Sequence, residues 1–137
     1  MSDRAFALEV VTPERVVVSR RDVVSLVAPG ALGYLGVLAN HSPLMAELTV
    51  GHLDFRRTDG STDSMAVSGG FLEVLRNKVT VLAETAELKD EIDVERAQRA
   101  LLRAQERLAA PSSDIDLARA DAALMRALNR LRVARRQ

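Results

Sequence analysis

Four arginines in the last third of the chain have the type and spacing to bind an anion. Arg126 and Arg130 are four residues apart, which puts them on one face of a helix, and Arg103 follows Arg96 by two helical turns. Guanidinium groups held close together repel one another unless an anion lies among them. Their planar forks match phosphate oxygens, and each charge-assisted hydrogen bond contributes about 1.5–3 kcal/mol. The spacing therefore favours a phosphate site, provided that the two segments fold against each other.

Two helices are predicted to bring these arginines together. Apolar and small residues recur every three or four positions from 94 to 108 and again from 117 to 134. The pattern breaks at 110–113, and so short a connection makes the helices antiparallel neighbours. Alanine at alternate positions of the seam buries little area, so we expect the hairpin to be marginally stable by itself. Folding at the break sets Asp93 and Arg96 beside the arginines of the second helix.

Acidic residues near the start of the first helix complete the predicted site. Glu87 and Asp93 would either pair with the arginines or accept hydrogen bonds from a base or ribose. An ordinary salt-bridged helix pair explains the same spacing and remains the alternative. Asp90 or Asp93 is predicted to cap the first helix, and Ser113 or Asp114 the second.

The first 87 residues are predicted to form an antiparallel β-sandwich or barrel. Apolar and polar residues alternate in short runs that are separated by Gly, Pro and Asp-Gly turns. Ser68-Gly69-Gly70 reads as a bulge or sharp bend, and the scarcity of aromatic residues predicts a core of Val, Leu and Met. The expected strands are 6–11, 15–19, 22–28, 34–38, 44–48, 53–57, 62–67, 71–76 and 78–83. The fold class is thus an all-β N-terminal domain followed by an α-helical antiparallel hairpin.

Composition and spacing argue against several other functions. With 19 basic and 19 acidic residues the formal net charge is zero, which does not suit a nucleic-acid partner. There is no cysteine, and His41 and His52 have no further ligand at suitable spacing, so no metal site is predicted. No apolar run of about 18 residues is present, and the N-terminus is too polar for a signal peptide, so we expect membrane contact only through a partner.

Neither a phosphate loop nor a catalytic centre is predicted in the β region. The glycines at 30, 33 and 36 are flanked by strand-like residues, whereas a phosphate loop needs a helix after it. Ser42 and Ser68 stand in no nucleophile–base pattern. We therefore do not expect an enzyme. The segment from 122 to the C-terminus holds five arginines and no acid, which makes its helix basic enough to seek an acidic partner.

Several segments, in the same order along the chain, resemble one protein family. They are Pro29–Leu44, Ala66–Val74, Val79–Glu84, Ile92–Ala97, and Asp114–Asp116 followed by Arg126–Leu131. They are similar to the signature segments of the epsilon subunit of the bacterial F-type ATP synthase, and Ile92–Ala97 is similar to the motif of members that bind ATP. The resemblance covers nearly the whole chain. Ala39 departs from it, because proline is common at that position in the family.

The resemblance implies a fold and a role for each part. Residues 1–87 would form a β-sandwich that joins the gamma subunit to the c-ring of the rotor, and residues 88–137 a regulatory helical hairpin. In the family the hairpin opens along gamma toward the beta subunits and blocks ATP hydrolysis, while bound ATP favours the closed form. The subunit would be non-catalytic, would help couple proton flow to ATP synthesis, and would lie at the cytoplasmic face of the bacterial plasma membrane within the complex.

Functional residues carry over by position. The ATP-binding residues implied by the resemblance are Glu87, Ile92, Asp93, Arg96, Ala97, Arg103, Arg126 and Arg130. Contact with the c-ring and gamma falls on Asn40, His41 and Ser42. ATP is thus expected as a regulatory ligand, and no metal site is predicted. Three alternatives stay open: the same rotor subunit with a vestigial nucleotide site, a free-standing nucleotide-sensing β-sandwich module, and a nucleotide-hydrolysing enzyme.

Overall fold

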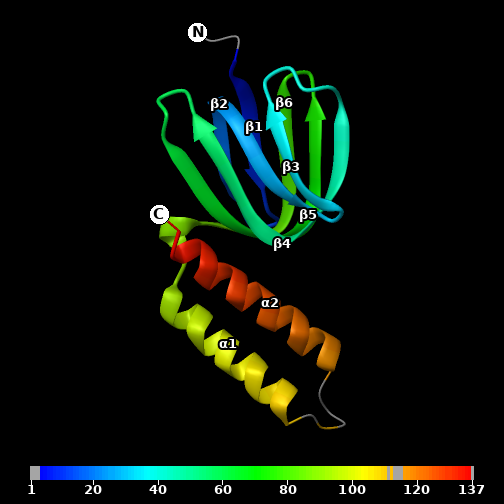
Figure 1. The fold of residues 1–137 in the computed structure, drawn as a ribbon, viewed down its shortest axis with the longest axis vertical. Coiled ribbons are helices and arrows are strands. Elements are labelled where there is room, and N and C mark those ends of the chain that lie inside the picture. The colour runs from blue at the N-terminus through cyan, green and yellow to red at the C-terminus, as the bar shows by residue number, and fades with distance from the viewer. Residues whose placement is uncertain (1–3, 111, 113–115, 137) are drawn as a thin grey trace.

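The N-terminal part of the chain is a six-stranded sheet that curls into a barrel, with two helices packed at one end (Figure 1). The computed structural model describes residues 4–110, 112 and 116–136. The strand order is β1-β6-β5-β4-β2-β3, and β1 also pairs with β2. The strands are β1 (Phe6–Val11), β2 (Val16–Gly30), β3 (Gly33–Leu38), β4 (Leu44–Arg57), β5 (Thr62–Leu75) and β6 (Lys78–Leu88).

The barrel closes through β1, which pairs antiparallel with β2 and parallel with β6. The sequence predicts an antiparallel arrangement, and this one pair differs. The reason is geometric, because the ring β1-β6-β5-β4-β2 has an odd number of members and strand directions cannot alternate all the way around it. Strand β3 lies outside the ring and pairs with the second half of β2.

Three strands are longer than the sequence predicts. The expected strands 15–19 and 22–28 are one element, β2; likewise 44–48 and 53–57 are β4, and 62–67 and 71–76 are β5. Register shifts interrupt the β2–β4 pairing, and β5 bends at two successive glycines with positive φ, 73° at Gly69 and 116° at Gly70. Bulges and glycine bends turn a strand around the corner of a barrel without ending it. The predicted breaks are therefore bends within continuous strands.

The barrel core is filled by inward-facing side chains from all six strands. Valine and leucine dominate it, as predicted, and Met65 is fully buried. The prediction omitted aromatic residues, yet Phe6 and Phe55 are both buried in this core. Gly70 allows β5 and β6 to meet, because a Cβ at this position would lie 2.0 Å from the carbonyl oxygen of Leu82.

The C-terminal helices form the predicted hairpin. A short 3-10 helix, η1 (Lys89–Glu91), leads into α1 (Val94–Ala109), and α2 (Leu117–Ala134) runs back beside it (Figure 1). The side chain of Asp93 caps α1 by accepting from the backbone N–H of Arg96 at 3.0 Å. Asp116 caps α2; Ser113 and Asp114, the predicted caps, lie outside the described residues. The buried residues of the seam are four alanines and one leucine: Ala97, Ala104, Ala120, Ala127 and Leu131.

Candidate functional site

The end of α2 docks on the barrel beside the start of the hairpin. Val133 is buried against Ala66 of β5 and against Ile92, which precedes α1, and Ala134 packs at the edge of this cluster. The start of the first helical segment therefore lies beside the end of the second, as the sequence predicts. Val133 lies outside the stripe that the helical periodicity selects, because α2 has two buried faces, one on α1 and one on the sheet.

Polar contacts surround this apolar cluster. Asn129 donates its side-chain N–H2 to the carbonyl oxygen of Gly51 at 2.8 Å and to that of Val67 at 3.4 Å. Arg136 donates from Nη2 to Oδ2 of Asp54 at 2.6 Å. Sequence reasoning missed these contacts. The signal available in the sequence was Asn129, an uncharged amide in a helix that consists mainly of Ala, Leu and Arg.

Two of the predicted ATP-binding residues are joined across the boundary between barrel and hairpin. Arg130 of α2 donates from Nε to Oε1 of Glu87, near the end of β6, at 2.5 Å. The two side chains are about equally exposed, at 29% and 33%. Glu87, which the sequence analysis names as a possible partner of the arginines, is therefore paired with Arg130 in the structure.

Other predicted ATP-binding residues are distributed between the helix seam and the surface. Ala97 is buried in the seam, Arg96 and Arg103 are exposed on α1, and Arg126 is half-buried on α2. Within the described ranges, Arg96, Arg103 and Arg126 form no side-chain hydrogen bond or ion pair. Asp93 is exposed and uses its carboxylate as the cap of α1. No side chain of the described part of the chain therefore uses the hydrogen-bonding capacity of these three guanidinium groups.

A further ion pair fixes the connection between barrel and hairpin. Arg15, in the turn after β1, binds Glu91 of η1 through two hydrogen bonds of 2.9 and 2.8 Å. Glu91 also accepts from the backbone N–H of Leu88 at 3.0 Å. The hydrogen bond from Arg15 lowers the pKa of the Glu91 carboxyl below its ordinary value, and the Leu88 N–H acts in the same direction.

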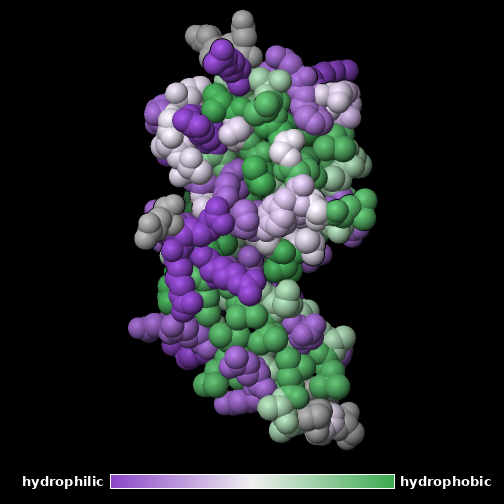
Figure 2. Space-filling view, viewed as in Figure 1, coloured by the Kyte–Doolittle hydropathy of each residue, from purple (hydrophilic) through white to green (hydrophobic). Residues whose placement is uncertain are grey.

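Hydrophilic side chains concentrate where the hairpin meets the barrel. Figure 2 shows them gathered beside the C-terminal end of α2, with hydrophobic side chains prominent farther along the hairpin. Arg132, Arg135 and Arg136 are exposed there. The basic end of α2 that the sequence predicts is therefore available at the surface in this arrangement.

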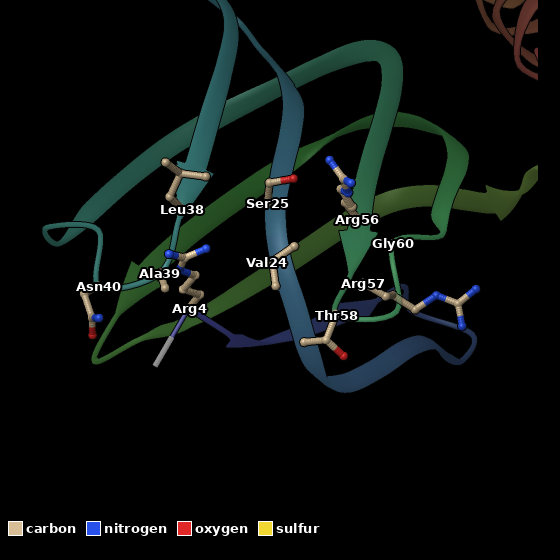
Figure 3. Close-up of a pocket in the computed structure, with 10 residues that line it drawn as sticks. All are labelled: Arg4, Val24, Ser25, Leu38, Ala39, Asn40, Arg56, Arg57, Thr58 and Gly60. Atoms are coloured by element: carbon tan, nitrogen blue, oxygen red, sulfur yellow. The ribbon is translucent and has the colours of Figure 1, made fainter. Parts of the chain in front are cut away.

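The predicted c-ring and gamma contact lies at the other end of the barrel. Asn40 has φ 61° and its N–H donates to the side-chain oxygen of Asn77 at 2.7 Å, while Nδ1 of His41 lies 2.6 Å from the carbonyl oxygen of Ser42. An open cavity of about 850 Å³ borders this loop, and Figure 3 shows Asn40 at its edge and the Arg57 side chain turned away. The cavity is lined by Arg4, Val24, Ser25, Leu38, Ala39, Asn40, Arg56, Arg57, Thr58 and Gly60.

In the described part of the chain, no three His, Asp or Glu side chains are grouped so that they could hold a metal ion. No described helix is both long and apolar enough to cross a membrane.

Comparison with known proteins finds two family models that match consecutive parts of the chain. Residues 5–89 match the family model of the ATP synthase delta/epsilon chain β-sandwich domain, and residues 90–135 match that of its long α-helix domain. An ATP synthase epsilon chain of Pelotomaculum thermopropionicum is 54% identical over 109 residues, covering 80% of each chain. One from Carboxydothermus hydrogenoformans is 56% identical over 109 residues, covering 80% of this chain and 79% of its own.

A solved structure shares the fold. A chain in the cryo-EM structure of the Euglena gracilis mitochondrial ATP synthase OSCP/F1/c-ring superposes with a TM-score of 0.77, at 24% identity, over 88% of this chain and 76% of that one. At this identity the likeness concerns the fold alone. Two family models that together span most of the sequence, and bacterial relatives at about half identity, show that this chain belongs to the delta/epsilon chain family of F-type ATP synthases as a non-catalytic epsilon chain.

Proposed function

We propose that this chain is a rotor subunit whose barrel attaches the gamma subunit to the c-ring and whose hairpin regulates ATP hydrolysis. Family membership supports the place in the central stalk, because solved relatives of the fold come from an F1/c-ring assembly. The Asn40–Ser42 loop is the proposed contact with the c-ring and gamma. As part of the complex, the chain lies at the cytoplasmic face of the bacterial plasma membrane and contacts the membrane indirectly.

The observation that carries the regulatory proposal is the small docking interface of the hairpin. Its apolar part is the cluster of Ala66, Ile92 and Val133, with Ala134 at the edge. Its ion pairs are partly exposed, and pairs of this kind contribute about 0–1 kcal/mol each. The barrel closes by its own strand pairing without help from α1 or α2. The hairpin can therefore leave the barrel without unfolding it, and its basic α2 can then reach acidic segments of the beta subunits.

ATP is the proposed ligand of the docked hairpin. Arg96, Arg103 and Arg126 have unused donors, and Arg130 lies one turn from Arg126 on α2. A ligand that binds only the docked form stabilises it by about 2.7 kcal/mol at a hundredfold excess over its dissociation constant. Against an interface of this size, such a shift changes which form dominates. Arg126 serves both forms in this proposal, holding phosphate when docked and an acidic partner when released.

Calorimetry with ATP tests the ligand. We expect heat of binding from the full chain and a markedly weaker signal from Arg126→Ala, while Arg119→Ala retains the wild-type signal because Arg119 is exposed near the start of α2. Arg126→Ala should also reduce inhibition of hydrolysis in the assembled synthase. A loss of only one of these two properties contradicts the shared role of Arg126.

A covalent lock tests the regulation. The chain contains no cysteine, so cysteines that replace Ala66 and Val133 form a unique pair across the docking interface. Joined directly or through a short cross-linker, they hold the hairpin on the barrel. We expect the locked synthase to hydrolyse ATP faster than the reduced one, because a docked hairpin cannot inhibit. Equal rates would refute the regulatory proposal and leave the rotor role in place.

A second candidate is the same rotor subunit with a vestigial nucleotide site. The Arg130–Glu87 pair favours this candidate, because the charge of Arg130 is already paired with a carboxylate of the protein itself. The absence of any calorimetric signal with ATP, with or without magnesium, would select this candidate.

A further inference from the structure

Two polar side chains, Asn129 of α2 and Arg136 two residues beyond its end, reach the barrel on either side of Val133, and the docking geometry depends on both. Asn129 contacts two strands, β4 and β5, through the carbonyl oxygens of Gly51 and Val67. Arg136, seven residues later, contacts Asp54 on β4. One contact comes from within α2 and the other from just beyond its end, so together they restrict both the position of α2 along β4 and its rotation about its own axis.

Gly51 lies beside an interruption in the pairing of β4 with β2. The pairing of β2 with β4 is interrupted between Val27 and Gly30, and Pro29, which has no N–H, lies within the interruption. Pro29 and Gly51 are in close contact, because a Cβ on Gly51 would lie 2.5 Å from the Cβ of Pro29. Gly51 is buried, and a buried carbonyl without a donor is unfavourable. The Asn129 amide supplies that donor.

Residues of the barrel hold the Asp54 carboxylate in place independently of Arg136. Its Oδ1 accepts a short hydrogen bond from the Ser64 hydroxyl, and His52 Nδ1 lies 3.1 Å from Oδ2. His52 is in turn stacked on Tyr34, with ring centroids 4.6 Å apart. The Asp54 side chain is only 18% exposed. A fixed, largely shielded carboxylate makes a more specific partner for an arginine than a mobile surface acid.

Apolar packing does not determine this part of the interface. A cavity of about 180 Å³ remains between α2 and the barrel, bordered by Gly51, His52, Asn129, Val133 and Arg136 among others. The apolar cluster around Val133 is small, and small apolar contacts tolerate sliding because they are not directional. Direction therefore comes from the two polar contacts.

We propose that Asn129 and Arg136 are positioning residues that select the docked form of the hairpin, with the Gly51 and Val67 carbonyls and Asp54 as their receptor on the barrel. This inference rests on the proposed function for its regulatory meaning, since it names the contacts that oppose release. The docked form itself is a property of the isolated chain and is tested there.

The test measures the distance between barrel and hairpin in the full chain by pulsed electron paramagnetic resonance. Spin labels on Lys78→Cys and Glu106→Cys, both exposed, report one distance from β6 to α1. We expect a single narrow distribution in the parent chain. Asn129→Ala and Arg136→Ala should each increase about fivefold the population at distances other than that of the docked form, which is the effect of losing one net hydrogen bond.

Matched variants separate positioning from general stability. Gln105→Ala removes an exposed amide from the same hairpin, and Arg135→Ala removes the neighbouring exposed arginine; both should keep the parent distribution. Asn129→Asp has the shape of asparagine but lacks the N–H2 donor, so it should behave like Asn129→Ala. Arg136→Ala and Asp54→Asn together should release no more than the stronger of the two alone, because they remove the same contact. The melting temperature of the barrel should stay unchanged in Asn129→Ala.

Distances in Asn129→Ala and Arg136→Ala that match those of the parent chain would overturn the inference. A drop in barrel melting temperature in Asn129→Ala would also overturn it, because the residue would then be structural. Neither measurement involves nucleotide or the assembled synthase. If release increases as expected while locking the hairpin leaves hydrolysis unchanged, the inference stands and the proposed regulation fails.

Discussion

Arg130 on α2 and Glu87 on β6 lie in direct contact, with the arginine Nε 2.5 Å from a carboxylate oxygen of the glutamate. The pair bridges the hairpin and the barrel and consists of two residues proposed to bind ATP. A phosphate bound at Arg130 would therefore compete with Glu87 for the hydrogen bonds of the Arg130 guanidinium.

Glu87→Gln should make docking less dependent on salt. Both side chains of the pair are about one-third exposed, so the ion pair contributes no more than about 1 kcal/mol. Screening weakens such a pair as ionic strength rises, and a neutral glutamine removes that component. The same spin-label distance, recorded from low to high sodium chloride, checks this. Glu84→Gln, on the same strand and exposed, is the control; an equal change in both variants would contradict the role of the pair.

The stabilising contribution of Glu91 should be lost as the pH is lowered. The hydrogen bonds from Arg15 lower the pKa of Glu91 in the folded chain below its ordinary value of 4.5. A lowered folded-state pKa contributes stability above the unfolded-state pKa, and this contribution is lost as pH falls through the folded-state pKa. Urea unfolding between about pH 6 and about pH 3 should show a smaller loss of unfolding free energy for Glu91→Gln than for the parent chain.

The Arg20–Asp22 pair serves as an internal reference when the parent chain and Glu91→Gln are compared. Arg20 binds Asp22 through two hydrogen bonds and lowers the pKa of that carboxyl in the same way, so both chains keep this part of the acid dependence. Identical acid dependence of the parent chain and Glu91→Gln would show that the Arg15 contact is not maintained in solution.

Asp93 offers a way to separate helix capping from ligand binding. Asparagine caps helices about as well as aspartate, whereas alanine costs about 1 kcal/mol. Asp93→Asn should therefore keep the helical content of the hairpin, measured by circular dichroism, and still bind ATP more weakly in calorimetry if the charge contacts the ligand. Asp93→Ala should lose both. Wild-type affinity in Asp93→Asn would mean that Asp93 acts only as the cap of α1.

Gly70 should be essential to the barrel, and Gly60 should not. Alanine at either position is strained, since φ is 116° at Gly70 and 88° at Gly60, and such strain costs about 1–2 kcal/mol. At Gly70 the added Cβ also overlaps the backbone of Leu82, whereas at Gly60 it meets nothing within 4 Å. We expect Gly70→Ala to cost more than about 3 kcal/mol and Gly60→Ala about 1–2 kcal/mol in chemical unfolding. Equal losses would mean that β5 and β6 separate easily.

The fold was largely predictable because its signals are local. Alternation before residue 88 and helical spacing after it indicate a β domain and a hairpin, and both are confirmed. Strand ends were wrong where a strand turns a corner. Arg20 and Arg21 fall between two predicted strands, 15–19 and 22–28, yet they continue β2: the Arg20 and Asp22 side chains pair with each other while the strand keeps β1 as its neighbour.

The site was predictable in part. The sequence offers Glu87 as a possible partner of the arginines, and the structure pairs it with Arg130. The spacing within each helix predicts which arginines lie near one another. The contacts of Asn129, Val133 and Arg136 were missed, because they depend on where the hairpin meets the barrel. The residue pattern of α2 carries no information about where Gly51 or Asp54 will lie. That information exists only once the strands have formed.

The joining of β1 to β6 orders the events of folding. Ala7 pairs with Lys78 and Val11 with Leu82, so the ring is complete only after nearly the whole β region has left the ribosome. Contacts between residues so distant in sequence form slowly, whereas α1 and α2 meet through a short connection. During synthesis the early strands must wait with an unpaired edge, and chaperone contact at that stage is expected on β1 rather than on the helices.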